Sequence, residues 1–68
     1  MNRFELLRYG AGLTRAELAD AAGIPVRTIR SLEDGSTQKP SAPVAKKLAD
    51  FYELTVADLL GLATEEAA

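Results

Sequence analysis

The side chains best suited to hold an anion or a hydrogen-bonding partner are two arginines three positions apart, Arg27 and Arg30. Both fall within residues 26–33, where the apolar residues Ile29 and Leu32 also recur at a spacing of three, as one face of a helix requires. Such a helix would bury Ile29 and Leu32 and leave both arginines on another side. A guanidinium presents a planar fork of N–H donors that matches phosphate and the edge of guanine. The pattern indicates a binding surface, and two solvated arginines on an outer helix face are the alternative.

Catalytic chemistry has little support in the sequence. The chain has no His and no Cys, so Ser31, Ser36 and Ser41 have no base to activate them as nucleophiles. The glycines at positions 10 and 12 stand between two predicted helices and not after a strand, which is not the setting of a phosphate-binding loop. The composition also excludes disulfides and the usual ligands of zinc. We therefore expect no enzyme, no metal and no cofactor, and no small-molecule ligand is indicated.

Length and composition favour one small helical domain. The chain has 68 residues, of which 47% are hydrophobic and 26% charged, a balance typical of a folded globule. A domain this small buries only roughly 60% of the surface of its unfolded chain, so packing alone must stabilise it. Twelve Ala and ten Leu outnumber Val and Ile, which favours helix over sheet. Apolar runs are too short to span a membrane, and residues 1–8 lack a signal-peptide pattern, so a cytoplasmic protein is expected.

Helix boundaries are predicted from the residues that begin and end a helix. Four polar residues stand where a side-chain cap is needed: Asn2, Thr14, Ser41 and Thr55. Two glycines stand where a left-handed residue ends a helix: Gly23 and Gly35. They delimit helices over residues 3–9, 15–22 and 26–33, a fourth helix after Ser41 and a short fifth helix after Thr55. The side chains expected to face the core are Phe4, Leu7, Leu18, Ala19, Ala22, Ile29, Leu32, Val44, Leu48, Phe51, Tyr52, Val56, Leu59 and Leu60. The predicted fold class is a compact, all-α, five-helix domain.

The link between the second and third predicted helices is only three residues long, Gly23-Ile24-Pro25. So short a link makes two helices cross at a large angle, which is the geometry of a helix-turn-helix. The second helix of such a pair has an inner face that holds it and an outer face that is free to enter the major groove of DNA. The sequence therefore predicts a helix-turn-helix formed by its second and third helices.

Several segments in register resemble the phage-repressor and Cro-type helix-turn-helix family, which is also called lambda-repressor-like or XRE. The segments are LTRAELA at 13–19, AGI at 22–24 and TIRSLEDG at 28–35, followed by PS at 40–41, KLA at 47–49 and LTVADLL at 54–60. The resemblance covers about residues 3–62, nearly the whole chain. It implies a five-helix lambda-repressor-like domain, taken as residues 1–62 before a short polar tail at 63–68, which binds duplex DNA with its third helix.

The resemblance also implies which side chains face DNA. Those placed at base edges in the major groove are Val26, Arg27 and Arg30, with Thr28 and Ser31 at the margin. Those placed near phosphates are Thr14, Arg15, Gln38, Lys39 and Ser41. Arg is the commonest bidentate partner of guanine, and a valine methyl suits the thymine methyl. Thr14 can serve equally as a helix cap, Arg15 can reach either a phosphate or a base, and the loop from 36 to 41 can be an ordinary solvated connection.

An ion pair between Arg8 and Glu33 is implied by the same resemblance, and its expected role is to fix the orientation of the third helix. Four features depart from the family pattern. One is the pair Phe51-Tyr52, which is bulkier than usual for its turn and is expected to pack in the core. Arg15 replaces the usual glutamine and cannot accept a hydrogen bond. Pro25 replaces a Ser or Thr cap, and Glu53 stands where a glycine usually ends the fourth helix, which costs roughly 1 kcal/mol if the backbone there is left-handed.

These features predict a sequence-specific duplex-DNA-binding transcriptional regulator that acts as a repressor, either a phage or mobile-element immunity repressor or a host regulator. An antitoxin-type autoregulator and a protein-interaction module on the same fold are the alternatives. A homodimer on an operator would place two recognition helices about 34 Å apart. The candidates for its self-contact are Leu6, Val56, Leu60 and Leu62, which belong to the core in the other interpretation.

The net charge of −2, taken alone, argues against a nucleic-acid partner. The charge is unevenly divided along the chain. Residues 1–39 carry six basic and five acidic side chains, whereas residues 40–68 carry two basic and five acidic ones. The sequence therefore allows DNA binding but predicts weak non-specific affinity and a greater dependence on specific contacts or on dimerisation.

Overall fold

Residues 2–61, the part of the chain that the computed structural model describes, form five helices and no strand. In chain order the helices are α1 (Arg3–Gly10), α2 (Arg15–Ala22), α3 (Val26–Asp34), α4 (Ala42–Tyr52) and α5 (Val56–Leu60). The predicted all-α class and the predicted order of helices are confirmed, and α1 and α3 each extend one residue further than expected. Leu62 and the predicted tail at 63–68 lie outside the described residues.

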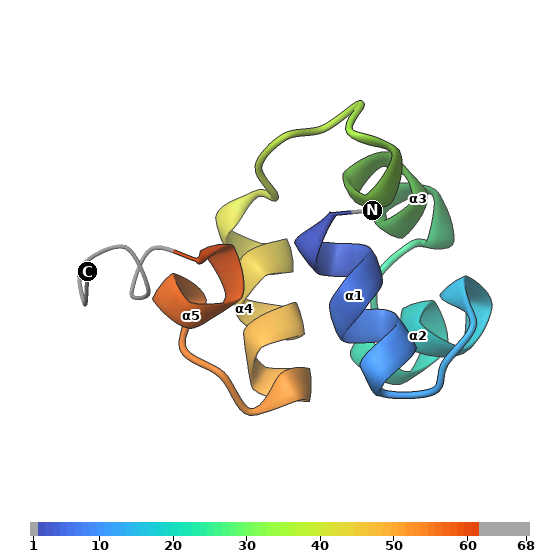
Figure 1. Ribbon diagram of the computed structural model, residues 1–68, viewed down its shortest axis with the longest axis horizontal. Helices are drawn as coiled ribbons and strands as arrows, with labels where there is room; N and C mark the ends of the chain where they lie inside the picture. Colours follow the sequence, from blue (N-terminus) through green and yellow to red (C-terminus); the bar gives the residue numbers. More distant parts are fainter. Residues whose placement is uncertain (1, 62–68) are drawn as a thin grey trace.

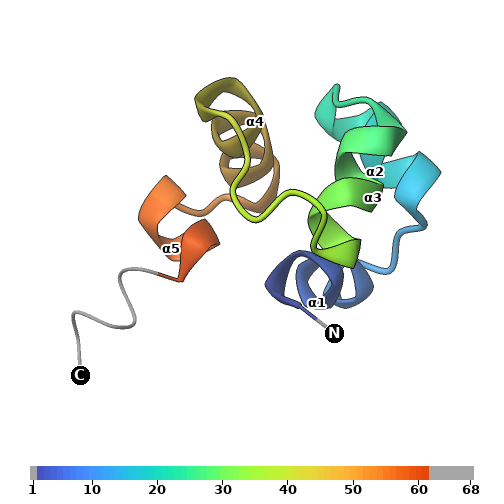
Figure 2. The ribbon, with the colours of Figure 1, turned by 90° about the horizontal axis from the view of Figure 1, so that it is seen from above.

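The helices form two groups. Figure 1 and Figure 2 show α1, α2 and α3 in one group and α4 and α5 in the other, with the loop after α3 passing between them. Helix α2 packs against both α3 and α4, and α1 packs against α3. The pair α2 and α3 is therefore supported by α1 on one side and by α4 on another.

Each predicted side-chain cap is present at the start of its helix. Asn2, Thr14, Ser41 and Thr55 all accept a hydrogen bond from the backbone N–H three positions later. The backbone N–H of Thr14 also donates to Glu17 at 2.8 Å, which completes the capping box that the sequence predicts. Helix α3 begins without a side-chain cap because Pro25 occupies the cap position, with φ −60°.

Left-handed residues end α2, α3, α4 and α5. Gly23 ends α2 with φ 73° and ψ 40°, a conformation that costs glycine little because it has no Cβ. Glu53 ends α4 with φ 58° and ψ 43°, and it is the one non-glycine residue with positive φ among residues 2–61. The departure at Glu53 thus places an ordinary side chain in a conformation that favours glycine.

The core lies where α2, α3, α4 and α5 meet. Its buried apolar side chains are Leu18, Ile24, Ile29, Leu32, Ala45, Leu48, Ala49 and Leu59. Phe4, Leu7, Val44, Phe51 and Tyr52 pack against this cluster, as predicted. The prediction for Val56 is wrong, because its side chain is 41% exposed. Val56 lies between the exposed residues Thr55 and Ala57 where the chain enters α5, and Leu59 fills the core from the far end of that short helix.

Three side chains bind carbonyl groups at the ends of distant helices. Asn2 donates to the carbonyl oxygens of Leu32 at 2.6 Å and Glu33 at 3.1 Å. Arg3 donates to the carbonyls of Leu59 and Asp58, and Lys47 donates to the carbonyl of Gly23. Carbonyls in the last turn of a helix lack the next turn's N–H groups, so these contacts help to satisfy them and join elements far apart in sequence. The carbonyl of Asp58 also accepts from the backbone N–H of Gly61 at 3.2 Å. No helix among residues 2–61 has both the length and the hydrophobicity to cross a membrane.

Candidate nucleic-acid interface

The helix-turn-helix is formed by α2, the three-residue turn and α3. The turn reverses at Gly23 and then buries Ile24, whose side chain is only 4% exposed. Ile24 joins Leu18 of α2 and Ile29 of α3 in the core. Burial of one residue from each part fixes the turn and both helices against the same core, so α3 is held rigidly by its inner face.

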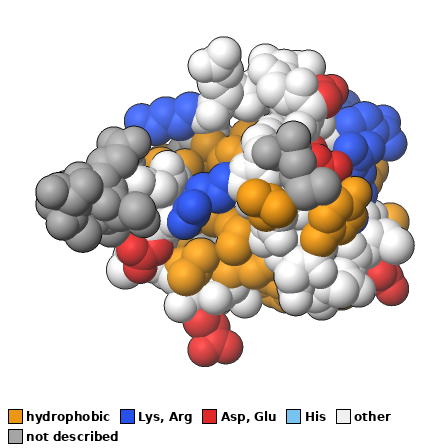
Figure 3. Space-filling view, in the orientation of Figure 1, with side chains coloured by type: hydrophobic (Ala, Val, Ile, Leu, Met, Phe, Trp, Pro, Cys, Tyr) orange, Lys and Arg blue, Asp and Glu red, His pale blue; other side chains and the backbone are white. Residues whose placement is uncertain are grey.

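The outer face of α3 carries the basic side chains that the sequence singled out. Ile29 is 2% exposed, whereas Val26 is 37% exposed and Arg27 and Arg30 are both exposed. Figure 3 shows Lys and Arg side chains gathered at the edge of the molecule where α3 lies. Neither arginine forms an ion pair or a side-chain hydrogen bond with another residue of the described part. Thr28, the remaining member of this face on the first turn, is half-buried.

An acidic residue ends this helix. The side chain of Asp34 accepts a hydrogen bond from the backbone N–H of Ser36 at 2.8 Å. The hydrogen bonds with Ser36, aided by the charges of Arg15 and Arg30, hold the pKa of Asp34 below its usual value. Asp34 is therefore ionised at neutral pH, and its charge limits how closely a phosphate can approach the C-terminal end of α3. Ser31, one turn earlier, is half-buried at the margin of the face.

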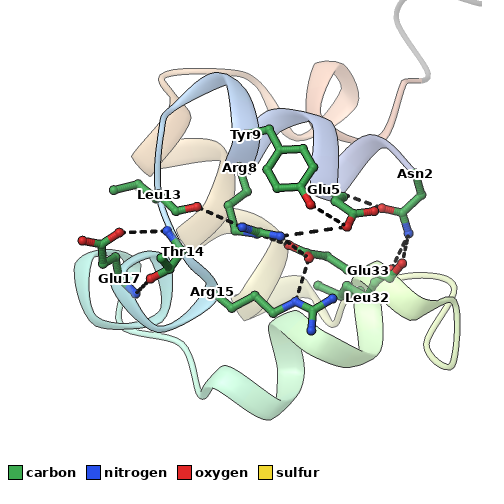
Figure 4. Close-up of polar contacts among 10 residues, drawn as sticks. All are labelled: Asn2, Glu5, Arg8, Tyr9, Leu13, Thr14, Arg15, Glu17, Leu32 and Glu33. Atoms are coloured by element: carbon green, nitrogen blue, oxygen red, sulfur yellow. Dashed lines mark hydrogen bonds and ion pairs between the residues drawn. The ribbon is translucent and has the colours of Figure 1, made fainter.

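Arg8 and Glu33 form a buried ion pair behind α3. The guanidinium donates from Nε to Oε2 at 2.7 Å and from Nη2 to Oε1 at 3.0 Å, and the two residues are only 6% and 7% exposed. Arg8 also donates from Nη1 to the carbonyl of Leu13 at 2.9 Å, and its guanidinium lies 4.6 Å from the ring centroid of Tyr9 (Figure 4). The expected contact between α1 and the end of α3 is thus present, and it reaches the residue before the cap of α2.

The ionisation of this pair follows from its hydrogen bonds. Burial alone raises the pKa of Glu33, but the hydrogen bonds and charges of Arg8 and Arg15 outweigh it and lower the pKa below 4.5. The hydrogen bonds that Arg8 donates to Glu33 raise the pKa of Arg8, against the opposing effect of burial. Both groups are therefore charged at neutral pH. Tyr52 contributes no hydrogen bond here, because its buried hydroxyl has no partner in the described part of the chain.

Arg15 joins the same carboxylate from the first position of α2. Its Nε donates to Oε1 of Glu33 at 2.9 Å, and its side chain is 38% exposed while that of Glu33 is 1% exposed. In Figure 4 the dashed line from Arg15 to Glu33 leaves from Nε, and neither terminal nitrogen is joined to another residue. The resemblance implies a place near a phosphate for Arg15, and the contact with Glu33 was not predicted from the sequence. The available signal was the replacement of a glutamine by a cation at a position that faces an acid in the fold.

The hydroxyls of Thr14 and Ser41 act as caps and remain exposed. Thr14 Oγ1 accepts from the backbone N–H of Glu17 at 3.1 Å, and Ser41 Oγ accepts from that of Val44 at 3.4 Å. A hydroxyl that accepts one hydrogen bond still has its own proton to donate. Both caps can therefore also donate to an anion, so capping and phosphate binding are compatible roles.

The loop after α3 presents Gln38 and Lys39 to solvent. The backbone N–H of Thr37 donates to the carbonyl of Ser31 at 3.1 Å, and Pro40 is buried, so the loop is anchored at both of its ends. Lys39 forms no ion pair with another residue among 2–61. The structure thus brings Arg8, Arg15 and Glu33 together, and it leaves the loop residues as a separate exposed group.

Comparison with known proteins agrees with this geometry. A family model described as a helix-turn-helix domain matches residues 2–67, almost the entire chain. The matched family is of the Cro and XRE type, the type that the sequence resembles. No curated protein and no solved structure matches the chain.

Proposed function

The chain belongs to the Cro- and XRE-like family of helix-turn-helix domains, which bind DNA, and we propose that it is a sequence-specific transcriptional repressor that contacts bases through α3. One observation supports this most strongly. The inner face of α3 is sealed in the core by Ile29 and Leu32, and its outer face presents Arg27 and Arg30 without partners among residues 2–61. A rigid helix with free guanidinium groups is suited to the major groove, which admits one α-helix.

The proposed base contacts follow from the chemistry of this face. Arg27 and Arg30 each donate two hydrogen bonds to O6 and N7 of a guanine, which is worth about 1–3 kcal/mol of discrimination per base. Val26 packs its methyl groups against a thymine methyl. Thr28 and Ser31 lie at the margin and add a hydrogen bond where a base or sugar comes close.

The proposed phosphate contacts flank this face. The N-terminus of α2 offers backbone N–H groups with the side chains of Thr14 and Arg15, and a helix N-terminus favours an anion. Gln38, Lys39 and Ser41 provide a second set of donors from the loop and from the start of α4. Contacts of this kind fix the register of a protein on the duplex without reading sequence.

Repression is the regulatory outcome that needs the least machinery. A domain that occupies an operator blocks access to it with its DNA-binding surface alone. A phage or mobile-element immunity repressor, a host regulator and an antitoxin-type autoregulator would all use the same surface in this way. We propose repression as the common activity.

A homodimer on the operator would add the affinity that weak non-specific binding does not supply. Leu6 is 57% exposed and Val56 is 41% exposed, so both are available for a self-contact. Leu60 is half-buried, and Leu62 lies outside the described residues. Tyr9, three positions after Leu6, is 52% exposed and extends the apolar surface of α1. The same surface supports the second candidate function, a protein-interaction module.

Selection of bound duplexes from a random pool tests the proposal. We expect enrichment of one motif that contains guanines, and a palindromic motif would indicate a dimer. The matched control is the double variant Arg27→Ala, Arg30→Ala, which changes only exposed side chains and should enrich nothing. If the wild-type protein enriches no sequence from the pool, the proposal of sequence-specific DNA binding is wrong, and the protein-interaction module is favoured.

A further inference from the structure

We propose that Glu33 is a positioning residue for DNA binding, which holds Arg15 by its Nε so that the two terminal nitrogens of Arg15 grip a single backbone phosphate. The inference rests on the proposed function and deepens it. To the proposed phosphate contact of Arg15 it adds the residue that holds Arg15 in place, and it gives the buried ion pair a part in DNA binding.

The hydrogen bond from Arg15 Nε to Glu33, called the tether below, holds one side of the guanidinium. Arg15 Nε lies 2.9 Å from Glu33 Oε1, and the carboxylate is 1% exposed while the arginine side chain is 38% exposed. Nε is therefore bound to a buried acceptor, whereas the edge formed by the two terminal nitrogens, the open edge, has no hydrogen bond to residues 2–61. The two terminal nitrogens are not joined to any of the residues drawn in Figure 4. Two parallel N–H donors on the open edge match two oxygens of one phosphate.

The carboxylate of Glu33 is itself held in a fixed position. Arg8 binds both oxygens of Glu33, at 2.7 Å and 3.0 Å, and is itself fixed by its bond to the carbonyl of Leu13. Glu33 cannot swing out to follow Arg15, so Arg15 is oriented by a fixed acceptor. An exposed arginine normally loses rotamer freedom when it binds a ligand, and a side chain ordered beforehand loses less.

The charges around Glu33 also favour an anion next to Arg15. Two cations share the carboxylate of Glu33, and Arg8 also lies 4.0 Å from the carboxylate of Glu5, so the charges alternate from Glu5 through Arg8 and Glu33 to Arg15. Arg15 is the cation at the end of this row, and its side chain is 38% exposed, so it presents a positive charge to solvent. A phosphate bound by Arg15 would extend this alternating row from α1 to the DNA. The tether also keeps Arg15 at the first position of α2, where a helix N-terminus attracts phosphate.

The first test uses the free protein. In nuclear magnetic resonance spectra, the Nε–H of Arg15 should exchange with water at least tenfold more slowly than those of Arg27 and Arg30, because it alone of the three donates to a buried carboxylate. Equal exchange rates for the three arginines would show that the tether is absent in solution, and the inference would fail. This measurement needs no variant and does not depend on DNA.

The second test replaces single phosphates of the selected duplex by uncharged methylphosphonate. At one position the replacement should weaken wild-type binding about tenfold and leave Arg15→Ala unaffected, because that variant has already lost the contact. The matched control Lys46→Ala, on the exposed Lys46–Asp50 pair of α4, should behave as wild type. If the duplex is bound but no position behaves in this way, Arg15 has no phosphate and only this inference fails. If the wild-type protein binds no duplex, the proposed function fails as well.

A third variant separates positioning from structure. Glu33→Gln has one acceptor oxygen for two arginines, so the exposed Arg15 should be released while Arg8 stays bound. We expect its response at the identified phosphate to fall toward that of Arg15→Ala, although Arg15 is present. An unchanged response in a folded Glu33→Gln protein would contradict the positioning role. If this variant does not fold, the exchange measurement on the wild-type protein decides the question.

Discussion

Arg8 on α1 and Glu33 on α3 face each other through two hydrogen bonds, of 2.7 Å and 3.0 Å, and each is more than nine-tenths buried. They are the buried charged residues of the described chain, in a core that is otherwise apolar. Removing two charges from water is costly, and the cost is offset only when the partners match in geometry. The pair therefore specifies how the recognition helix sits on α1 more than it adds to stability.

Removing one partner of the pair should destabilise the protein far more than replacing both partners. Arg8→Ala leaves the carboxylate of Glu33 buried with Arg15 as its remaining partner, and we expect a loss of about 3–5 kcal/mol in the free energy of unfolding. Urea denaturation followed by circular dichroism measures this loss. The double variant Arg8→Met, Glu33→Leu removes both charges and should recover most of it. A loss below about 1 kcal/mol in Arg8→Ala would mean that the pair is solvated.

Acid should weaken the fold through Glu33. Its pKa in the folded protein lies below the ordinary value of 4.5, so its contribution to stability is complete above that value and disappears as the pH falls through the lower folded pKa. We expect urea midpoints to be level at neutral pH and to fall below about pH 5. Asp50→Asn, in the exposed pair with Lys46, should keep this dependence. The same pH profile in Glu33→Gln would assign the effect to other groups.

A glycine at position 53, where α4 ends, should increase the stability of the fold. Glu53 adopts φ 58° and ψ 43°, so Glu53→Gly should stabilise the protein by about 1 kcal/mol in thermal or urea unfolding. Glu53→Ala is the matched control, because it removes the same side chain and keeps the Cβ that causes the strain. Equal effects of the two substitutions would place the benefit in the charge and not in the backbone.

Lys39 should act on all duplexes alike. It is exposed and has no ion pair within residues 2–61, so its proposed partner is a phosphate. Lys39→Ala should weaken cognate and random duplexes by the same factor and reduce the salt slope of binding by about one. Fluorescence anisotropy over a range of salt concentrations measures both. A salt slope identical to that of the wild-type protein would show that Lys39 does not contact DNA.

The local features of the fold could be predicted from the sequence, because each depends on residues close together in the chain. The capping box of Thr14 and Glu17 and the left-handed Gly23 are examples, since three or four residues determine each of them. The exposure of Val56 could not be predicted in this way. Its spacing to Leu59 and Leu60 fits one helix face, but the place where the chain enters α5 leaves it in solvent.

The candidate site could be predicted only in part. The outer face of α3 followed from the spacing of Arg27 and Arg30 against Ile29. The bond from Arg15 to Glu33 spans 18 positions, and the bond from Asn2 to the carbonyl of Leu32 spans 30. Such contacts depend on how three helices pack, which spacing along the chain does not encode.

Recognition of base pairs by α3 is tested most directly by measuring how Arg27→Ala binds a set of matched duplexes. Affinities are measured for the selected duplex, for duplexes with each base pair changed singly, and for a random duplex at the same salt concentration. Arg27→Ala should lose about 1–3 kcal/mol on the selected duplex and lose the preference at one base pair, with the other preferences kept. An equal loss on the selected and random duplexes would show that Arg27 holds only phosphate and would contradict the account.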